Sequence, residues 1–541
     1  MTAIPDFTVP STDDQTLDGE QAEARPQSKG RNRHVLWIAL LALVVSFGAF
    51  SMDGNVGINL ADEGYLWYGL TAIRAGEVPM RDFHAYDPGR YYWIAGWSYV
   101  LGDGLVSMRA ACVLFQCVAM VCGLLAVRRV SREWWFLGLV ALILVPWMTP
   151  QFKLFEQAIS LMAIYVAVRL IERPTVRQHF FTGIFIGLMA FMGRNHGIYQ
   201  VGAFGLVTLF LARGEWAQLP KRVLACAGGI VVGYLPQLLM MAFVPGFFDA
   251  FIVQLKTDLA GRSQVASPVP WPWEVWEKSS GFVGWAIRSQ SVFYVLLPTV
   301  VVVAAVRLWR FGREGITRYP LLPAAACVTL FYAHHSFSRP DWIHLGHSVP
   351  AMILAVIAVA HAISSKPKHW LPVTVTFVLL VLTIPARLLY NGMFTELRSP
   401  AGWYVEREVR GQTMHIPLYF DGILKMGDRV ANELAKPGEG VAFLPHWPGL
   451  YPATNRLSPS FQTYFIVPMP GEEEDATIAS FKAKGVKWVV LHDYALDGRD
   501  DLRFHRTNPR VFAYLRENFR PVKVPNLPEH TVVLRLVEKE G

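Results

Sequence analysis

Residues 35–52 read VLWIALLALVVSFGAFSM, a run without a charged side chain. This composition is typical of a helix that crosses a lipid bilayer, which needs about 20 mostly apolar residues. The run follows a polar segment, residues 1–34, rich in Pro, Ser, Gln and Gly, which predicts a disordered N-terminus. No small-residue cleavage site stands out after the run, so we predict an uncleaved first membrane helix and not a removed signal peptide.

Ten further apolar runs follow the first one, and together they fill residues 35–390. The predicted spans are residues 35–52, 105–127, 134–149, 155–171, 179–193, 198–212, 223–245, 291–308, 319–334, 348–364 and 370–390. The pair 179–193 and 198–212 gives the weakest pattern. The expected fold class is therefore an α-helical polytopic membrane protein with about eleven spans.

Composition supports a bilayer as the main partner of this chain. The sequence is 53% hydrophobic and only 17% charged, with a mean hydropathy of +0.30. A soluble protein of this length would be less apolar. The net charge of +8 could suggest nucleic acid, but the Lys and Arg residues lie in short loops beside the apolar runs. We therefore expect no nucleic-acid partner.

The basic residues also predict an orientation. They gather before the first span and in alternate loops, at residues 128–132, 173–177, 213–222, 307–318 and 366–368. Basic loops normally stay on the cytoplasmic side. An odd number of spans then places the N-terminus in the cytoplasm and residues 391–541 outside it.

Residues 391–541 predict a small extracytoplasmic α/β domain. Strand patterns occur at 440–445, 486–491 and 531–537, and helical patterns at 474–484 and 509–519. The five cysteines all lie in apolar runs, so this domain is expected to fold without disulfides.

Polar residues collect in three segments predicted to face outward: 53–104, 246–290 and 335–347. Asp62 and Glu63 follow shortly after the first span, where adjacent carboxylates are costly unless they are used or paired. Neighbours on a helix point about 100° apart. One carboxylate could then act on a substrate while the other holds a cation or an arginine. The alternative is an ordinary solvated helix end.

The first outward segment carries an ordered set of motifs, DEGYLWYGLTAIRAGEVPMRDFHAYDPGRYYW, at residues 62–93. Asp-Glu-Gly, Gly-x-x-Pro-x-Arg-Asp-Phe and Tyr-x-Pro-Gly elements in this order resemble the first outer loop of the GT-C glycosyltransferases. This superfamily includes the bacterial aminoarabinose transferases and the protein O-mannosyltransferases. The detailed resemblance covers roughly residues 50–104.

The resemblance implies transfer of a sugar, a hexose or a pentose, from a polyprenyl-phosphate carrier to a glycan, lipid or protein acceptor. It also points to a bacterial inner membrane. Asp62 is implied as the general base that deprotonates the acceptor hydroxyl, with Glu63 as the second catalytic carboxylate.

A departing lipid phosphate needs cations, and arginine binds phosphate in a bidentate manner. The candidate residues for binding the substrate or the lipid phosphate are Arg81, Asp82, Tyr86, Arg90, Arg194, His196, Arg339, Asp341 and His344. Arg194, Arg339 and His344 are the strongest for phosphate. Two alternatives remain: Arg339 pairs with Asp341 to cap a helix, and Arg194 lies near lipid headgroups.

Four histidines, at 334, 335, 344 and 347, lie near one outward edge. A divalent cation is conceivable there, but no helical HxxxH spacing is present, so no residue is assigned as a metal ligand. Some relatives in the superfamily use a divalent ion and some do not.

Two rival functions remain at this point. A transporter or lipid flippase predicts ionisable residues near mid-bilayer and discontinuous helices in repeated halves. A non-catalytic scaffold would merely present the C-terminal domain. The enzyme hypothesis, which we favour, predicts that Asp62 and Arg339 converge in the folded chain.

Overall fold

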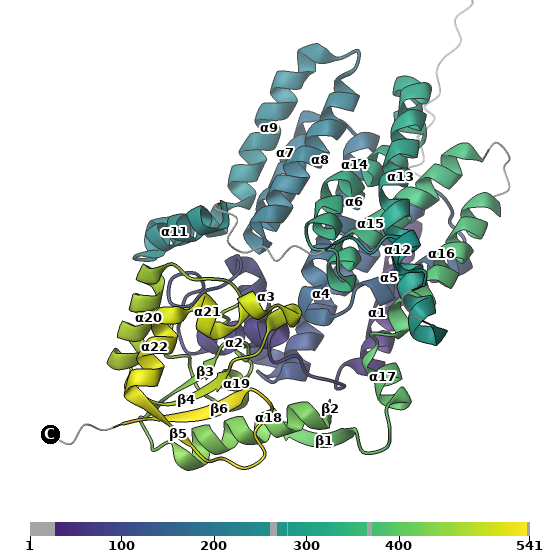
Figure 1. Cartoon of the computed structure of the whole chain (residues 1–541). Coiled ribbons are helices and arrows are strands. Elements are labelled where there is room, and N and C mark those ends of the chain that lie inside the picture. The colour runs from purple at the N-terminus through teal and green to yellow at the C-terminus, as the bar shows by residue number, and fades with distance from the viewer. Residues whose placement is uncertain (1–26, 260–267, 278–279, 365–369, 538–541) are drawn as a thin grey trace, which may run out of the picture.

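The computed structural model describes residues 27–259, 268–277, 280–364 and 370–537. Helices dominate residues 27–388, and the strands of the C-terminal domain gather at one end of the helix bundle (Figure 1). Most of the predicted N-terminal disorder, residues 1–26, lies outside the described residues. Helix α1 begins at Gln27 and not at residue 35, so part of the polar segment extends the first helix.

Every predicted span corresponds to a helix of the described residues. These helices are α1 (Gln27–Asp53), α4 (Leu105–Val127), α5 (Trp134–Trp147), α6 (Leu154–Glu172), α7 (Val176–Met192), α8 (Arg194–Ala212), α9 (Leu219–Gly233), α10 (Leu235–Phe243), α13 (Gly281–Arg318), α14 (Leu321–Ser338), α15 (Trp342–Ile363) and α16 (Trp370–Leu388). The run at 223–245 is divided between α9 and α10, which are bent by 52°.

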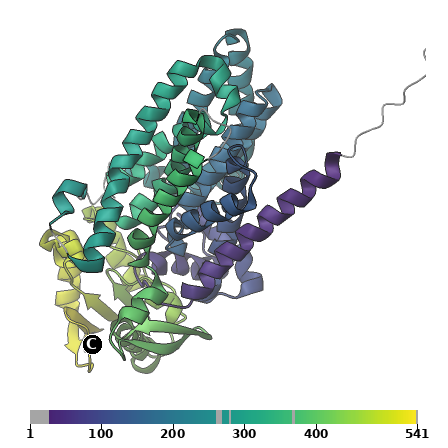
Figure 2. The same ribbon diagram turned by 90° about the vertical axis from the view of Figure 1, so that its right-hand side faces the viewer.

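The chain is an integral membrane protein. Within the described residues, six helices are long and apolar enough to cross a membrane, and the bent pair α9–α10 would make a seventh span. Helices α5 and α7 are apolar but shorter. The predicted count of eleven spans is therefore not confirmed. Figure 2 shows α1 leaning away from the other helices toward its N-terminal end, and only 17% of its apolar window is buried.

Two short helices lie between the bundle and the C-terminal domain. Helices α2 (Asp62–Arg74) and α3 (Pro88–Leu101) follow α1 and precede α4 (Figure 1). Most of α2 is buried, including Tyr65, Trp67 and Tyr68. Burial of such large aromatic side chains fixes the helix firmly in place. The start of α2 is therefore a rigid platform.

The other helices outside the bundle flank it or follow it. Helices α11 (Phe247–Leu259) and α12 (Pro272–Val275) precede α13, and α17 (Gly392–Arg398) leads into the C-terminal domain.

The C-terminal domain combines a hairpin, a mixed sheet and helices. Strands β1 (Tyr404–Val409) and β2 (Gln412–Pro417) form the antiparallel hairpin. The sheet has the order β3-β4-β6-β5, in which β3 is parallel to β4 and the other pairs are antiparallel. Its strands are β3 (Gly440–Leu444), β4 (Val486–His492), β5 (Phe519–Val522) and β6 (Thr531–Leu536).

Helices α18 (Leu418–Asp428), α19 (Leu450–Ala453), α20 (Gly471–Ala483), α21 (Phe504–Thr507) and α22 (Pro509–Asn518) complete the domain. The predicted α/β class is confirmed. The strands at 440–445, 486–491 and 531–537 and both predicted helices are present. The hairpin, β5 and α18 were not among the predicted elements.

Candidate functional site

Helix α2 begins at the end of the bundle that faces the C-terminal domain, and Asn59 caps its first turn. The Asn59 Oδ1 accepts hydrogen bonds from the backbone N–H groups of Ala61 and Asp62, each at 3.0 Å. These bonds satisfy donors that a helix start leaves open. Asp62 is partly buried, whereas Glu63 is 1% exposed. The two carboxylates therefore face different surroundings.

Glu63 points into the protein, where Arg109 of α4 binds it. The Arg109 Nε and Nη2 atoms each lie 2.7 Å from a Glu63 carboxylate oxygen. Arg109 also donates to the backbone carbonyls of Gly54, Val56 and Gly57. The pair thus ties the segment between α1 and α2 to the bundle. Arg109 was missed from the sequence, although an arginine within an apolar run is itself a signal of a buried partner.

Asp62 differs from Glu63 in having no ion-pair partner. Across the described residues, no basic side chain lies within 4 Å of its carboxylate. Two groups are close enough to interact with it electrostatically, Lys153 of the bundle and Tyr464 of the C-terminal domain. Asp62 is thus a carboxylate held at the junction of the two parts of the protein, without a cation bound directly to it.

Lys153 is a cation of this junction that sequence reasoning missed. It ends the short 3-10 helix η1 (Gln151–Lys153) that precedes α6. Its Nζ lies 3.4 Å from the Tyr86 hydroxyl and 5.5 Å from the centre of the Tyr86 ring. No carboxylate of the described part of the chain lies within 4 Å of it. The sequence feature that could have identified Lys153 is its position as a lysine at the edge of an apolar run.

Arg90 is a buried residue of α3 that joins three helices. Its guanidinium is 4.8 Å from the Tyr86 ring centre, and its Nη1 lies 3.2 Å from Glu156 of α6. Its Nε donates to the Met192 carbonyl at the end of α7. A charge so thoroughly buried is stable only when it is paired in this way. Glu156 was missed from the sequence.

Arg194 forms a second ion pair between the first loop and the bundle. Its Nε lies 2.7 Å from Asp87 Oδ1, and its backbone N–H donates to Asp87 Oδ2 at 2.9 Å. Asp87 is the residue before Pro88, which begins α3. The carboxylate therefore joins the start of α3 to the start of α8, where an anion is favourable.

Arg339, Asp341 and His344 form one cluster between α14 and α15. The Asp341 Oδ1 caps α15 by accepting from the backbone N–H groups of Ile343 and His344. Its Oδ2 lies 2.8 Å from His344 Nδ1 and 3.3 Å from Arg339 Nε. Burial opposes ionisation of Asp341, but its bond to His344 and the nearby Arg339 hold its pKa below the usual value. Asp341 thus caps α15 and pairs with Arg339, which is the alternative that the sequence left open.

His196 belongs to a histidine and tyrosine cluster in the same end of the bundle. Its Nδ1 lies 3.1 Å from the Tyr332 hydroxyl, and its ring stacks on Tyr332. The ring centres of His335 and His347 are 5.0 Å apart, and those of His344 and His347 are 5.1 Å apart. Over the residues that the structure describes, no group of three or more His, Cys, Asp and Glu side chains has a geometry that could hold a metal ion.

Arg81 and Asp82 form a separate local pair. The Arg81 Nη2 lies 2.7 Å from Asp82 Oδ2, and the same oxygen accepts from the Val78 backbone N–H. The hydrogen bond to Arg81 holds the pKa of Asp82 below its usual value. In the described ranges, the contacts of Arg81 beyond this pair are with Pro245, and not with the groups around Asp62.

Tyr464 of the C-terminal domain interacts electrostatically with both Asp62 and Arg339. Its ring centre lies 6.1 Å from that of Tyr65, which is one turn along α2 from Asp62. Burial, and then the negative charge of Asp62, raise the pKa of Tyr464 well above 10, whereas the positive charge of Arg339 lowers it. Asp62 and Arg339 thus both act electrostatically on the same phenol. Their convergence on one outer cavity stays a prediction. Tyr464 is far from both in the sequence, and no sequence signal pointed to it.

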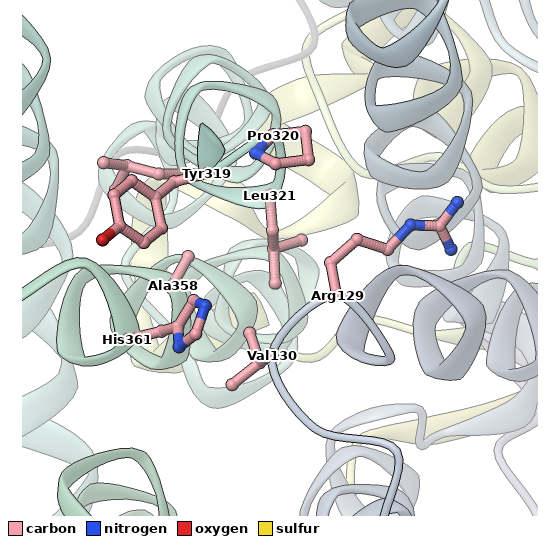
Figure 3. Close-up of a pocket in the computed structure, with 8 residues that line it drawn as sticks. Arg129, Val130, Tyr319, Pro320, Leu321, Ala358 and His361 are labelled. Carbon is pink, nitrogen blue, oxygen red and sulfur yellow. The ribbon is translucent and has the colours of Figure 1, made fainter. Parts of the chain in front are cut away.

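A small recess lies at the opposite end of the bundle (Figure 3). Arg129, Tyr319 and His361 contribute to its lining. Tyr319 precedes α14 and His361 ends α15, whereas Arg339 and Asp341 occupy the turn between these helices. Arg129 is already bound to Glu172 at 2.8 Å. This recess is therefore separate from the groups around Asp62.

Comparisons with known proteins bear on the fold. No family model and no curated protein matches the sequence. Among solved structures, ArnT from Cupriavidus metallidurans bound to undecaprenyl phosphate is similar, with a TM-score of 0.52 and 14% sequence identity over 94% of this chain and 98% of that chain. The fold is that of the GT-C glycosyltransferases.

Two further structures are similar at lower scores. ArnT in the apo state gives a TM-score of 0.49 and 13% identity over 94% of this chain and 98% of that chain. The archaeal oligosaccharyltransferase AglB from Archaeoglobus fulgidus gives 0.48 and 12% over 94% of this chain and 76% of that chain. The fold inferred from the motifs in the first outward segment is confirmed by the similarity to ArnT at a TM-score of 0.52. At this identity the similarity establishes the fold and not the reaction.

Proposed function

We propose that this GT-C chain is a membrane glycosyltransferase. It moves a sugar from a polyprenyl-phosphate carrier to an acceptor hydroxyl of a glycan, lipid or protein at the outer face of a bacterial inner membrane. The N-terminus is cytoplasmic and the C-terminal domain extracytoplasmic, which agrees with the basic residues in the loops distant from the C-terminal domain. Asp62 is the general base.

The contrast between two adjacent carboxylates carries this proposal. Glu63 is held by Arg109 at 2.7 Å, whereas no basic side chain of the described residues lies within 4 Å of Asp62. A carboxylate with a bound cation is a poor base, because the cation stabilises its ionised form. Asp62 keeps its capacity to accept a proton and stands at the first turn of a rigid helix. These are the properties that general base catalysis requires.

The reaction then proceeds in one balanced step. The acceptor oxygen forms a bond to the anomeric carbon while the bond from this carbon to the phosphate oxygen breaks. Asp62 takes the proton of the acceptor hydroxyl. The lipid phosphate leaves with the electron pair, and its negative charge needs nearby cations.

Lys153 and Arg339 are the cations that we assign to the leaving phosphate. Lys153 interacts electrostatically with Asp62 and has no directly bound carboxylate in the described residues. Arg339 acts on the same tyrosine as Asp62 and is held by Asp341 at 3.3 Å and Asp497 at 3.6 Å, but its side chain remains 37% exposed, so it can still reach a phosphate. Tyr86, against the Lys153 ammonium, would border the same space. The ArnT structure of the same fold holds undecaprenyl phosphate, which supports this class of donor.

The other predicted polar residues support the site from a distance. Arg90, Arg194 and His344 are each engaged with a carboxylate, namely Glu156, Asp87 and Asp341. His196 is bound to Tyr332. In this proposal these residues hold α3, α6, α8 and α15 together around the donor. Arg81 and Asp82 form a local pair that shapes the first loop.

The test uses purified protein in lipid nanodiscs with radiolabelled undecaprenyl-phosphate hexoses and pentoses, and native membranes as the acceptor source. Wild type is compared with Asp62→Asn. Asp249→Asn, at an exposed position of α11, is the matched control. We expect transfer by wild type and by the control, and a loss of about 100-fold to 10,000-fold in Asp62→Asn.

Equal transfer by Asp62→Asn and wild type would exclude Asp62 as the base. Absence of transfer with every donor would overturn the proposed reaction. In that case, the same purified protein is placed in sealed liposomes, and movement of the labelled donor across their bilayer would indicate the transporter or flippase alternative.

A further inference from the structure

The C-terminal domain makes close backbone contact with the helix that carries Asp62. The Gly449 backbone N–H donates to the Leu60 carbonyl at 2.9 Å, two residues before Asp62. A Cβ atom on Gly64 would lie 2.4 Å from the Gly449 nitrogen. Such a distance requires glycine on α2, because no side chain fits between the two backbones. The C-terminal domain is therefore docked directly on the first turn of α2.

Two more contacts hold the segment 458–465 of the C-terminal domain against this region. The Ser458 backbone N–H donates to the Tyr68 hydroxyl of α2 at 3.2 Å. The Phe461 carbonyl accepts from the His84 backbone N–H at 2.8 Å. The first half of this segment is thus fixed to α2 and to the loop that carries His84, which restricts where the residues that follow can lie.

Tyr464 is placed by this segment at the side of α2 that bears Asp62. The Phe465 backbone N–H donates to the Pro445 carbonyl at 3.0 Å and so brings Tyr464 beside His446, with ring centres 6.0 Å apart. On its other side the Tyr464 ring lies 6.1 Å from the Tyr65 ring. Tyr65 and Asp62 are three residues apart on the same face of α2, so the Tyr464 hydroxyl lies on the side of the Asp62 carboxylate, whose charge acts on it.

The hydroxyl of Tyr464 is a donor under all ordinary conditions. Burial, followed by the charge of Asp62, raises its pKa well above 10, so the phenol stays protonated. A carboxylate accepts hydrogen bonds and donates none when it is ionised. A hydrogen bond between the two groups therefore has one direction, with the phenol as donor and Asp62 as acceptor.

We propose that Tyr464 of the C-terminal domain is a positioning residue for Asp62. Its hydroxyl donates to one carboxylate oxygen, holds the other oxygen toward the acceptor and favours the ionised form. The inference rests on the proposed function, since it concerns Asp62 as the base. It makes the C-terminal domain a part of the catalytic site and not only a surface for the acceptor.

Other titratable groups surround Asp62 and Tyr464, and the test must separate them from Tyr464. Lys153 of η1 interacts electrostatically with Asp62, and Tyr86 and Arg339 interact with Tyr464. Tyr65 and His446 lie against the Tyr464 ring, and Glu63, next to Asp62 in α2, is bound to Arg109. None of these changes when the phenol alone is altered. A single-atom change at Tyr464 therefore isolates its contribution.

The experiment measures kcat/KM for transfer as a function of pH in wild type and Tyr464→Phe. The acid limb of this profile reports ionisation of the base in the free enzyme. Loss of a donor to the ionised carboxylate destabilises that form. We expect the midpoint of the acid limb to rise by about one pH unit in Tyr464→Phe. Tyr419→Phe, at an exposed tyrosine of α18, is the matched control and should leave the limb unchanged.

Replacement of Tyr464 by 3-fluorotyrosine provides a second measurement that retains the shape of the side chain. Its more acidic phenol is a stronger donor, so the acid limb should move to lower pH, opposite to the effect of phenylalanine. A uniform loss of activity in both variants with an unmoved limb would overturn the inference and leave Tyr464 a structural residue.

The two hypotheses fail in different ways. Suppose that wild type transfers sugar in a manner that depends on Asp62, but the acid limb of the pH profile is unchanged in both Tyr464 variants. This result would exclude the role of Tyr464 and leave the proposed function in place. Absence of wild-type transfer from every donor would remove both.

Discussion

Arg109 and Glu63 form a buried ion pair in which two guanidinium nitrogens each lie 2.7 Å from a carboxylate oxygen. Glu63 is 1% exposed and Arg109 is 5% exposed. The pair also fixes the backbone at Gly54, Val56 and Gly57. The pair thereby fixes the backbone between the end of α1 and the start of α2, which carries Asp62. Glu63 anchors this backbone through Arg109, whereas the adjacent Asp62 takes no part in the ion pair.

Glu63→Gln should destabilise the protein much more than Asp62→Asn. Removing one partner of a buried ion pair leaves the other charge uncompensated, at a cost of about 3–5 kcal/mol. We expect a clear fall in the unfolding temperature for Glu63→Gln and for Arg109→Met, measured in detergent by tryptophan fluorescence. Asp62→Asn, which breaks no ion pair within the described residues, should remain within about 1 kcal/mol of wild type.

The same variants test the role of Glu63 in the chemistry. If Glu63→Gln kept the wild-type unfolding temperature and yet abolished transfer, Glu63 would take part in the reaction directly and its structural assignment would be wrong. A loss of activity in proportion to the loss of folded protein supports the anchoring role.

Lys153→Gln should weaken donor binding. Lys153 has the Tyr86 hydroxyl at 3.4 Å and no bound carboxylate in the described ranges, so its charge is available for a phosphate. A hydrogen bond to a charged group contributes about 1.5–3 kcal/mol, so the KM for the polyprenyl-phosphate donor should rise by about 10-fold to 100-fold. Lys523→Gln, at an exposed position of the C-terminal domain, is the control. An unchanged KM would exclude Lys153 from the phosphate site.

The sequence predicted the local parts of this site and missed the distant ones. Asp62, Tyr86 and Arg90 lie in one continuous stretch whose order is itself informative. Arg109 and Glu156 occur within apolar runs that were interpreted as membrane spans, and the single charged residues in these runs were not assigned a role. An ionisable residue in such a run is costly unless it is paired, so each could have been identified as a buried partner without knowledge of its place in the fold.

Tyr464 illustrates what a single sequence does not contain. It lies beside Asp62 because the C-terminal domain docks on α2 through Gly449, and this docking depends on the shapes of two separately folded parts. The partners of the predicted arginines were equally hidden, since Asp87 binds Arg194 and Glu156 binds Arg90 across different helices. Residue types therefore predicted a polar site, but the tertiary structure decided which charges are neutralised.

Gly64→Ala should loosen the C-terminal domain from α2. The added Cβ would lie 2.4 Å from the Gly449 nitrogen, and backbone on both sides leaves no flexible side chain to move. Overpacking of this kind costs about 1–3 kcal/mol. We expect faster proteolysis between the bundle and the C-terminal domain and reduced transfer. Gly96→Ala in α3 is the control because nothing lies within 4 Å of its Cβ. Equal proteolysis of the two variants would contradict the docking described here.

Stability should decrease as the pH falls from about 6.5 to about 4, because three histidines are held neutral. Burial is the main cause that lowers the pKa of His84, His446 and His492 to about 4 each. The unfolded chain takes up protons near the ordinary value of about 6.5, so it binds more protons than the folded protein in this window. The stabilisation is thus present above pH 6.5 and is lost toward pH 4.

The measurement is the unfolding temperature of wild type and His446→Phe over this pH range. His446→Phe removes one of the titrating rings and should make the unfolding temperature fall less steeply with decreasing pH. Because His446 lies next to Tyr464, with ring centres 6.0 Å apart, its protonation would also place a positive charge near Asp62. An identical slope in the two proteins would show that His446 takes up its proton equally in the folded and the unfolded protein, so that burial does not lower its pKa.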